Sequence, residues 1–321
     1  MTEIGGYFGL EEFLGREYYP KLIAVNYARN AIVALLKEKG CSKVWLPYYL
    51  CDEVQKACCR AGINVMYYHV TSRLLPLFPS EIKPEDGVLL VNYFGRLSEQ
   101  EIREYAQPYK NVVVDNTQAF FAEPLPSIDT VYTCRKFFGV PDGAYISTKI
   151  SFQNIQGEQT AMKQMEYLVG RYEGGAEAYY KAYQQAEKHI AHTQLAKMSR
   201  ISHNILRVLN YEEIAKRRWE NYNHLKISLD ELNQNCLPCH SAPFAYPFVT
   251  NKASYLREQL REQAVFVPTL WPNVLELDPA KSSERAIAEK ILPLPCDHRY
   301  ATEQMEKMIS IIRKNMEEDS V

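Results

Sequence analysis

The sequence predicts an α/β protein, in which a large domain with a mostly parallel sheet sandwiched by helices is followed by a smaller C-terminal α+β domain. In the first half of the chain, short apolar stretches typical of strands alternate with stretches in which apolar residues recur at helical spacing. The strand-like stretches are apolar along their whole length, as in parallel sheets that are covered on both faces. From about residue 151 this alternation ends and helical patterns predominate.

The alternation in the first half can be followed element by element. Apolar residues at helical spacing predict a helix over 27–39, which Gly40 ends. Ser98 is a suitable N-cap for a helix over 98–109. The other predicted elements are a helix at 52–62 and buried strands at 43–47, 63–70, 87–95 and 111–115. Parallel strands of this kind bind ligands beyond their carboxyl ends, where Asn92 and Asp115 are expected to lie.

The second half is predicted to be helical first and mixed afterwards. Residues 155–230 have mostly helical patterns, interrupted at Gly174–Gly175 and near Asn210. The end of the chain combines predicted strands at 244–250 and 264–272 with predicted helices at 252–263 and 301–314. We therefore expect a large domain over 1–230, which includes the long helical segment, and a small C-terminal domain over 231–321.

Composition and charge exclude several classes of protein. With 37 basic and 39 acidic residues the formal net charge is −2, which gives no field for nucleic acid or for an anionic membrane. No apolar run is long enough to span a bilayer, and the acidic N-terminus does not resemble a secretory signal. The eight cysteines are irregularly spaced, as expected of reduced thiols in a cytoplasmic protein. The 23 tyrosines suit an interface or a polar pocket.

A single lysine stands in an unusual setting. Lys136 lies among aromatic and small residues in TVYTCRKFFGVPDGAYI, directly before a turn with two glycines. A lysine in such a setting is either an ion-pair partner or a nucleophile. Desolvation lowers the pKa of a lysine and so favours the neutral amine, which is the nucleophilic form. A nucleophilic lysine is what pyridoxal phosphate (PLP) requires, because its aldehyde forms a Schiff base with an amine.

The remaining requirements of PLP are also met by the first half of the chain. Its ring nitrogen needs a carboxylate, and Asp115 ends a predicted buried strand. Its phosphate needs N–H groups and hydroxyls, such as those of a helix N-terminus. The candidates for the phosphate are Ala28, Arg29 and Asn30 in the opening turn of the first helix, together with Thr133. Tyr49 is the candidate to cover the ring, and Gln118 the candidate to hydrogen-bond its hydroxyl.

These residues carry a resemblance to a known family. The run VDNTQAFF…TCRKFFGVPDGA resembles the Asp-x-x-Gln/His-Ala…Lys…Gly segment of the DegT-like sugar aminotransferases, which are fold-type-I PLP enzymes. NYARNAIVALL, KVWLPYYLCDEV and VNYFGRLSEQEI are similar to the family's first helix and its next strands. EEIAKRRWENYNHL, VPTLWP and ILPLPCDHRY resemble the segments that close the family's chain. The likeness therefore extends over nearly the whole sequence in order.

The resemblance implies a function and an assembly. It implies a PLP-dependent aminotransferase that takes a small-molecule amino donor and a carbonyl acceptor such as a keto-sugar. It makes Lys136 the Schiff-base lysine, Asp115 the ring-nitrogen partner and Gln118 its neighbour, all in the large domain. It also implies a homodimer with a shared active site, for which the segments 167–183 and 198–209 are the candidate contacts.

The chain also departs from the family. Residues 27–30 replace the family's Ser-Gly-Thr phosphate turn, residues 132–135 its Ser-Phe-His approach to the lysine, and residues 141–144 its Gly-Glu-Gly-Gly stretch. The residue that stacks on the ring falls near Cys51 by counting. Two alternatives therefore stay open, namely a non-catalytic homologue that binds PLP or a partner, and a PLP enzyme of another reaction type.

Each candidate also has an ordinary structural alternative. The alternative role is an ion pair for Lys136 and Arg29, and a helix N-cap for Asp115. It is a turn residue for Gln118, a strand residue for Thr133 and a core residue for Tyr49. The CLPCH motif at 236–240 lacks a second ligand pair nearby, so no metal site is expected. The basic cluster of Lys216, Arg217 and Arg218 lies among glutamates and is expected to be a solvated, salt-bridged helix face.

Overall fold

The computed structural model describes residues 4–317 apart from 154, 159–160 and 279–281. Its main feature is a ten-stranded sheet, in which neighbouring strands follow the order β4-β3-β2-β5-β6-β7-β8-β1-β10-β9. The strands, in chain order, are β1 (Ile23–Val25), β2 (Lys43–Pro47), β3 (Asn64–Val70), β4 (Pro76–Leu77), β5 (Gly87–Val91), β6 (Asn111–Asp115), β7 (Asp129–Thr133), β8 (Ala144–Ser147), β9 (Gln156–Glu158) and β10 (Ala196–Lys197). The five consecutive strands β3, β2, β5, β6 and β7 are parallel to one another. The predicted α/β class with a mostly parallel sheet is confirmed.

The helices of the first half connect the parallel strands. They are α1 (Ala28–Glu38), α2 (Asp52–Arg60) and α3 (Glu99–Ala106), each within a few residues of its predicted position. Ser98 caps α3 as predicted, because its hydroxyl accepts a hydrogen bond from the Glu101 amide while the Glu101 side chain binds the Ser98 amide. Gly40 and Gly62 follow α1 and α2 with φ values of 70° and 77°, a conformation that favours glycine.

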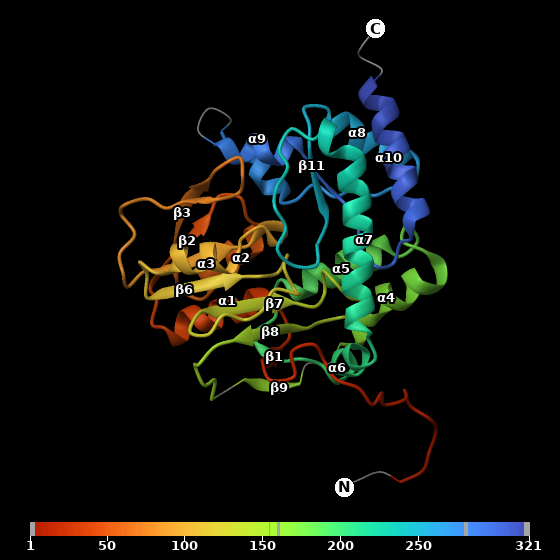
Figure 1. Cartoon of the computed structure of the whole chain (residues 1–321). Helices are drawn as coiled ribbons and strands as arrows, with labels where there is room; N and C mark the ends of the chain where they lie inside the picture. The colour runs from red at the N-terminus through yellow and green to blue at the C-terminus, as the bar shows by residue number, and fades with distance from the viewer. Residues whose placement is uncertain (1–3, 154, 159–160, 279–281, 318–321) are drawn as a thin grey trace.

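The second half begins with a series of helices, as predicted, and ends in a small sheet. The helices are α4 (Met162–Gly174), α5 (Tyr180–Ile190), α6 (Arg200–Arg207) and α7 (Tyr211–Leu229). Strands β11 (Tyr246–Val249) and β12 (Ile291–Leu294) then form an antiparallel pair, accompanied by α8 (Ala253–Glu262), α9 (Ser283–Lys290) and α10 (Thr302–Glu317). Figure 1 shows the long helix α7 running from the neighbourhood of the large sheet to these C-terminal elements.

One predicted strand is wrong. Residues 264–272 form no strand: Ala264 and Trp271 have φ values of 58° and 55°, and prolines at 268 and 272 cannot donate to a ladder. The strand that pairs with β11 is instead β12, whose Pro293 lies opposite Pro247. Val267 nevertheless packs in the C-terminal core without strand pairing, whereas Phe266 beside it is 60% exposed.

Helix α7 contributes to two hydrophobic cores. Its Tyr222, Leu225 and Leu229 pack with β11, β12, α8 and α10 in the C-terminal core. Its Ile214 packs with the aromatic residues around Tyr19 and Phe120. The division of the chain at residue 230 stays a prediction. None of the helices that the structure describes is long and apolar enough to cross a membrane.

Candidate active site

The site is built where β6 and β7 end. Asp115 is the last residue of β6 and is 4% exposed, and Thr133 is the last residue of the adjacent strand β7. Lys136 follows in a turn in which the amides of Phe137 and Phe138 donate to the Cys134 carbonyl. Both phenylalanine rings are buried, so they anchor the turn while the Lys136 side chain remains accessible to solvent.

Thr117 connects the lysine to the carboxylate. The Lys136 Nζ donates to the Thr117 Oγ1 at 2.9 Å, and the Thr117 amide donates to the Asp115 Oδ1 at 2.8 Å. The pKa of Lys136 is lowered because protein atoms crowded around the amine desolvate it, and the nearby Asp115 carboxylate only partly opposes this effect. The arrangement therefore holds a desolvated amine with an increased neutral fraction close to a buried carboxylate.

Two polar groups at this site, one on Asp115 and one on Gln118, can form hydrogen bonds that no described residue supplies. The second carboxylate oxygen of Asp115 accepts no hydrogen bond from the residues that the structure describes. The Gln118 Oε1 accepts a hydrogen bond from the Phe94 amide at 2.9 Å, whereas its amide nitrogen has no partner within the described chain. Gln118 thus fixes the backbone after β5, where Phe94 has a φ of 54°, and retains two N–H donors.

The N-terminus of α1 lies beside the end of β7 because of the strand register. Thr133 pairs with Ala144 on β8, and Ala144 pairs with Val25 on β1, directly before α1. The amides of Ala28 and Arg29 in the first turn have no hydrogen-bond partner in the described part of the chain, and neither has the Thr133 hydroxyl. These donors, together with the positive end of the helix dipole, suit an anionic group.

The side chains of the first turn of α1 are otherwise engaged. The Arg29 guanidinium pairs with Glu53 at 2.8 Å, as in the ordinary alternative for this residue. The Asn30 side chain donates to the Thr193 hydroxyl and to the Gln194 carbonyl, which ties α1 to the segment before β10. Contributions of residues 28–30 to a bound anion therefore come from the backbone amides of Ala28 and Arg29.

Tyr49 lies in the core. Its ring is fully buried and packs edge-on against Trp271 and near Tyr93, with centroid distances of 4.5 and 5.5 Å. Its role as ring cover stays a prediction. In the same segment Cys51 lies close enough to Lys136 for the charges of the two groups to influence each other, although burial dominates and raises the pKa of the thiol.

Arginines 135 and 218 surround the lysine turn in different ways. The Arg135 guanidinium pairs with Glu187 of α5 and donates to the Tyr167 hydroxyl of α4 at 3.3 Å. Arg218, on α7, is 1% exposed and donates to the Phe137 carbonyl at 3.1 Å. Its predicted place on a solvated helix face is wrong, since only its neighbours Lys216 and Arg217 are on that face, where they lie near Glu213 and Glu220.

Two residues of the site were missed by sequence reasoning. Thr117 lies between the predicted Asp115 and Gln118, and the only available signal was its place directly after a strand end. Arg218 was hidden in a basic cluster. Its helical phase offered a signal, because Ile214, Asn221 and Tyr222, three or four residues away on the same face, are all buried.

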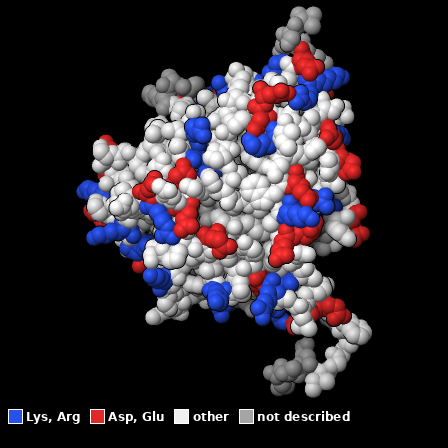
Figure 2. Space-filling view, viewed as in Figure 1, with Lys and Arg blue, Asp and Glu red and all other residues white. Residues whose placement is uncertain are grey.

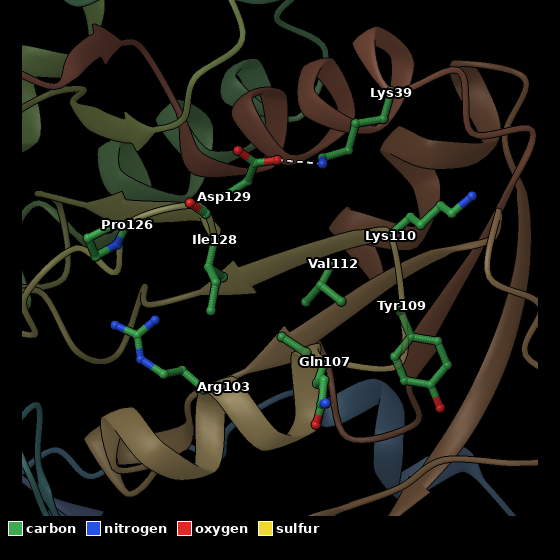
Figure 3. Close-up of a pocket in the computed structure, with 11 residues that line it drawn as sticks. Lys39, Arg103, Gln107, Tyr109, Lys110, Val112, Pro126, Ile128 and Asp129 are labelled. Carbon is green, nitrogen blue, oxygen red and sulfur yellow. Dashed lines mark ion pairs between the residues drawn. The ribbon is translucent and has the colours of Figure 1, made fainter.

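A hollow of about 310 Å³ lies elsewhere, at the amino-terminal ends of the strands (Figure 3). The ends of α1 and α3 and the starts of β6 and β7 line it, and an ion pair joins Lys39 and Asp129 across 2.6 Å. None of the predicted site residues contributes to it. No group of His, Cys, Asp and Glu side chains suited to a metal is present in the described part of the chain.

The comparisons with known proteins concern the fold. No family model matches the sequence, and no curated protein matches it either. Among solved structures, DesV of S. venezuelae is 17% identical with a TM-score of 0.63 over 91% of this chain and 84% of that chain. A DegT DnrJ EryC1 StrS aminotransferase from Brucella abortus is 15% identical with a TM-score of 0.63, over 91% and 85% of the two chains.

A third similar structure is that of DesI, determined in the presence of its TDP-sugar product. It is 15% identical to this chain with a TM-score of 0.63, over 91% of this chain and 79% of DesI. Sequence identities of this size establish the arrangement of the backbone and leave the chemistry to the site residues. The chain has the fold that these aminotransferases share.

Proposed function

We propose that the protein is a PLP-dependent aminotransferase that acts on a keto-sugar or a related small carbonyl compound. The observation that carries the proposal is the connection of Lys136 through Thr117 to Asp115 beyond two adjacent strand ends. The likeness of the fold to sugar aminotransferases supports it, and DesI, whose structure was determined with a TDP-sugar product, supports the class of acceptor.

The hydrogen-bond donors and acceptors of the site that have no partner in the described chain fit this cofactor. The amides of Ala28 and Arg29 and the Thr133 hydroxyl would hold the phosphate. Asp115 would keep the ring nitrogen protonated through the carboxylate oxygen that has no partner in the described chain, and the Gln118 amide nitrogen would donate to the ring hydroxyl. When bound, PLP supplies an aldehyde that reacts with amines and a ring that accepts electrons.

Lys136 would bind the cofactor and then move a proton. Its lowered pKa increases the fraction of neutral amine near pH 7, which both nucleophilic attack and proton abstraction require. After release from the cofactor, the amine would take the proton from the Cα of the amino donor and return it to the acceptor carbon. Thr117 would hold the amine within reach of both positions through its hydroxyl.

In this proposal the protein is cytoplasmic and forms a homodimer whose two copies share each site. Its substrates are an amino donor and a carbonyl acceptor. Exposed tyrosines in α4 and α5 support a partner surface, since Tyr172 is 88% and Tyr180 56% exposed. The Arg135–Glu187 pair links this surface to the turn that carries Lys136. The eight cysteines are unpaired, which is consistent with the cytoplasm.

The test is the capture of PLP at Lys136. We expect the purified chain to become yellow with PLP, and borohydride followed by mass spectrometry to find the pyridoxyl group on Lys136. Lys136→Ala should abolish this capture, whereas the control Lys149→Ala, at an exposed position, should not. Amino donors should then convert the cofactor to its amine form. A chain that takes up no PLP would support a non-catalytic homologue that binds a partner, and capture without any amine form would support a PLP-binding homologue or another reaction type.

A further inference from the structure

Two arginines act on the amine of Lys136 through their charge. Desolvation is the main cause of the lowered pKa of Lys136, and the guanidinium groups of Arg135 and Arg29 add to this effect. Arg135 directly precedes the lysine, and Arg29 lies in the first turn of α1, which the strand register places beside the end of β7. A substrate that reacts at Lys136 therefore comes close to two guanidinium groups.

Arg135 is fully held by its surroundings. Its guanidinium pairs with Glu187, donates to the Tyr167 hydroxyl at 3.3 Å and lies 5.7 Å from the centroid of the Tyr27 ring. Its Nε is buried and has no partner in the described part of the chain. Because a carboxylate already compensates its charge and its Nε is closed to solvent, Arg135 is not available to a substrate.

Arg29 is only partly engaged. Its Nη1 pairs with Glu53 in the first turn of α2 at 2.8 Å. Its Nε and Nη2 donate to no residue that the structure describes, and its side chain reaches solvent with 15% of its surface exposed. The backbone amide of Arg29 is a separate donor, which is assigned above to the cofactor phosphate. The side chain can therefore take a ligand of its own.

Glu53 does not depend on Arg29 for a cation. Its other carboxylate oxygen lies 3.2 Å from the amine of Lys56, one turn further along α2. It also lies at the N-terminus of α2, where the helix dipole favours a negative charge. An anion that drew Arg29 away would leave Glu53 paired with Lys56, so most of the penalty for leaving a charge without a partner is avoided.

The surface outside the site gives an anion no general attraction. Figure 2 shows basic and acidic side chains lying next to one another on the face in view, and the formal net charge of the chain is −2. The recognition of an anionic substrate therefore depends on individual groups close to Lys136.

We propose that the Arg29 side chain binds the carboxylate of an α-amino acid, which serves as the amino donor. The inference rests on the proposed function, in which the donor nitrogen takes the place of the Lys136 amine, and it adds the class of donor and the residue that selects it. In an α-amino acid the carboxylate is attached to the carbon that carries the nitrogen, so it lies close to the position of that amine. A guanidinium with unused N–H groups binds a carboxylate through two parallel hydrogen bonds.

The first experiment follows the conversion of bound PLP to its amine form by absorbance. L-Amino acids are compared with the amines that result from the loss of their α-carboxylate, such as L-alanine with ethylamine. Arg29→Met should raise the concentration of amino acid that gives half of the maximal rate by about 10- to 100-fold, which is the value of a charged hydrogen bond, and should not change the weak response to the amine. Arg29→Lys should restore part of the loss.

Two controls accompany this experiment. Lys37→Met removes an exposed cation from the last turn of the same helix and should have no effect on the response to amino acids. PLP capture at Lys136 should be equal in the wild-type chain and in Arg29→Met. Loss of capture in Arg29→Met would assign the side chain to the cofactor and overturn the inference.

Glu53→Gln tests the exchange of partners. If Glu53 competes with the substrate for Arg29, its removal should lower the concentration of amino acid that gives half of the maximal rate by about two- to fivefold, the value of a partly exposed ion pair. An ion pair that only supports the structure predicts the opposite sign, because Glu53→Gln would then weaken the response to amino acids as Arg29→Met does.

A further experiment needs no cofactor. Phenylglyoxal modifies accessible guanidinium groups, and mass spectrometry measures the rate at each arginine of the PLP-free protein. We expect Arg29 to react faster than Arg135, and acetate to slow the reaction of Arg29 relative to chloride at the same concentration. Equal rates in acetate and chloride would show that Arg29 does not bind carboxylates.

The outcomes separate the two proposals. If the chain captures no PLP, the proposed function falls and the class of donor with it, while the phenylglyoxal experiment still decides whether Arg29 binds carboxylates. If PLP is captured and converted equally well by amino acids and by their decarboxylated amines, the proposed function stands and the role of Arg29 is refuted.

Discussion

At the scale of single residues, Thr117 determines how the amine and the carboxylate of the site are arranged. Its hydroxyl accepts from the Lys136 amine and its backbone amide donates to Asp115, so one residue orients both groups. A hydroxyl that accepts a hydrogen bond from an amine stabilises the charged form more than the neutral form. Thr117 therefore opposes the effect of desolvation, which lowers the pKa of Lys136.

Replacing Thr117 by valine removes this acceptor and keeps the shape of the side chain. The pKa of Lys136 should fall further, so the neutral amine should be more abundant below that pKa. A net hydrogen bond is worth about 0.5–1.5 kcal/mol, which corresponds to about a two- to tenfold faster reaction of Lys136 with an amine-selective reagent at neutral pH. Mass spectrometry of the cofactor-free protein across pH measures this rate for Lys136 alone.

Thr117→Ser is the matched control, because it retains the hydroxyl and should preserve the pH profile of the labelling. If the valine variant shifts the profile toward higher pH, or if serine and valine act alike, Thr117 does not control the amine. The readout needs no cofactor, so it remains informative should the proposed function fail.

Sequence reasoning could identify the site residues that follow strand ends, and it could not assign their contacts. Lys136 and Asp115 could be identified because each stands in a pattern of neighbouring residues. Lys136 is a single lysine directly before a turn, and Asp115 is a carboxylate at the end of an apolar stretch. The ion pair of Arg29 with Glu53 and the burial of Tyr49 against Trp271 depend on partners 24 and 222 positions away in the sequence. Which of two reasonable roles a side chain has is decided by such distant partners.

At the scale of elements, the predictions succeeded where the periodicity was strong. Helices α1, α2 and α3 and the parallel strands β2, β3, β5 and β6 lie where their patterns predicted them. Strands β7 and β8 were not predicted, because the polar residues and turns around Lys136 interrupt their apolar pattern. Residues 264–272 have the composition of a strand but two prolines, and Val267 packs in the C-terminal core without a ladder.

Helix α7 holds the lysine turn through one buried cation. Arg218 donates to the Pro243 carbonyl at 2.9 Å and to the Phe137 carbonyl at 3.1 Å, and its guanidinium lies 4.6 Å from the centroid of the Phe137 ring. Desolvation lowers the pKa of this arginine. No carboxylate within ion-pair distance accompanies it in the described chain, so the two carbonyls and the ring provide its stabilisation.

Replacing Arg218 by methionine should destabilise the protein, because it leaves the carbonyls of Pro243 and Phe137 buried without donors. We expect a loss of about 2–4 kcal/mol in the free energy of unfolding, measured by urea denaturation. Arg217→Met is the matched control on the exposed face of the same helix and should change the free energy by no more than about 0.5 kcal/mol. Equal losses in the two variants would contradict the structural role of Arg218.

At the scale of the whole molecule, α7 packs against both of the parts that are predicted to meet at residue 230, namely 1–230 and 231–321. It supplies Tyr222, Leu225 and Leu229 to the C-terminal core and Ile214 to the aromatic core beside the lysine turn. A continuous helix cannot unfold in one core and remain intact in the other without losing packed side chains. We therefore expect the two parts to unfold together, as one cooperative unit.

Calorimetry with and without PLP tests this coupling. A ligand that binds only the folded state at 100 times its dissociation constant adds about 2.7 kcal/mol, which raises the Tm of a chain of this size by about 4 °C. If α7 couples the cores, one transition should shift as a whole, although the residues proposed to bind PLP all precede residue 137. Asp115→Asn should reduce the shift, because a neutral amide would stabilise a protonated ring nitrogen less than the carboxylate does. Two transitions of which only the first responds to PLP would show instead that the C-terminal part unfolds independently. Helix α7 would then connect the two cores without coupling their unfolding.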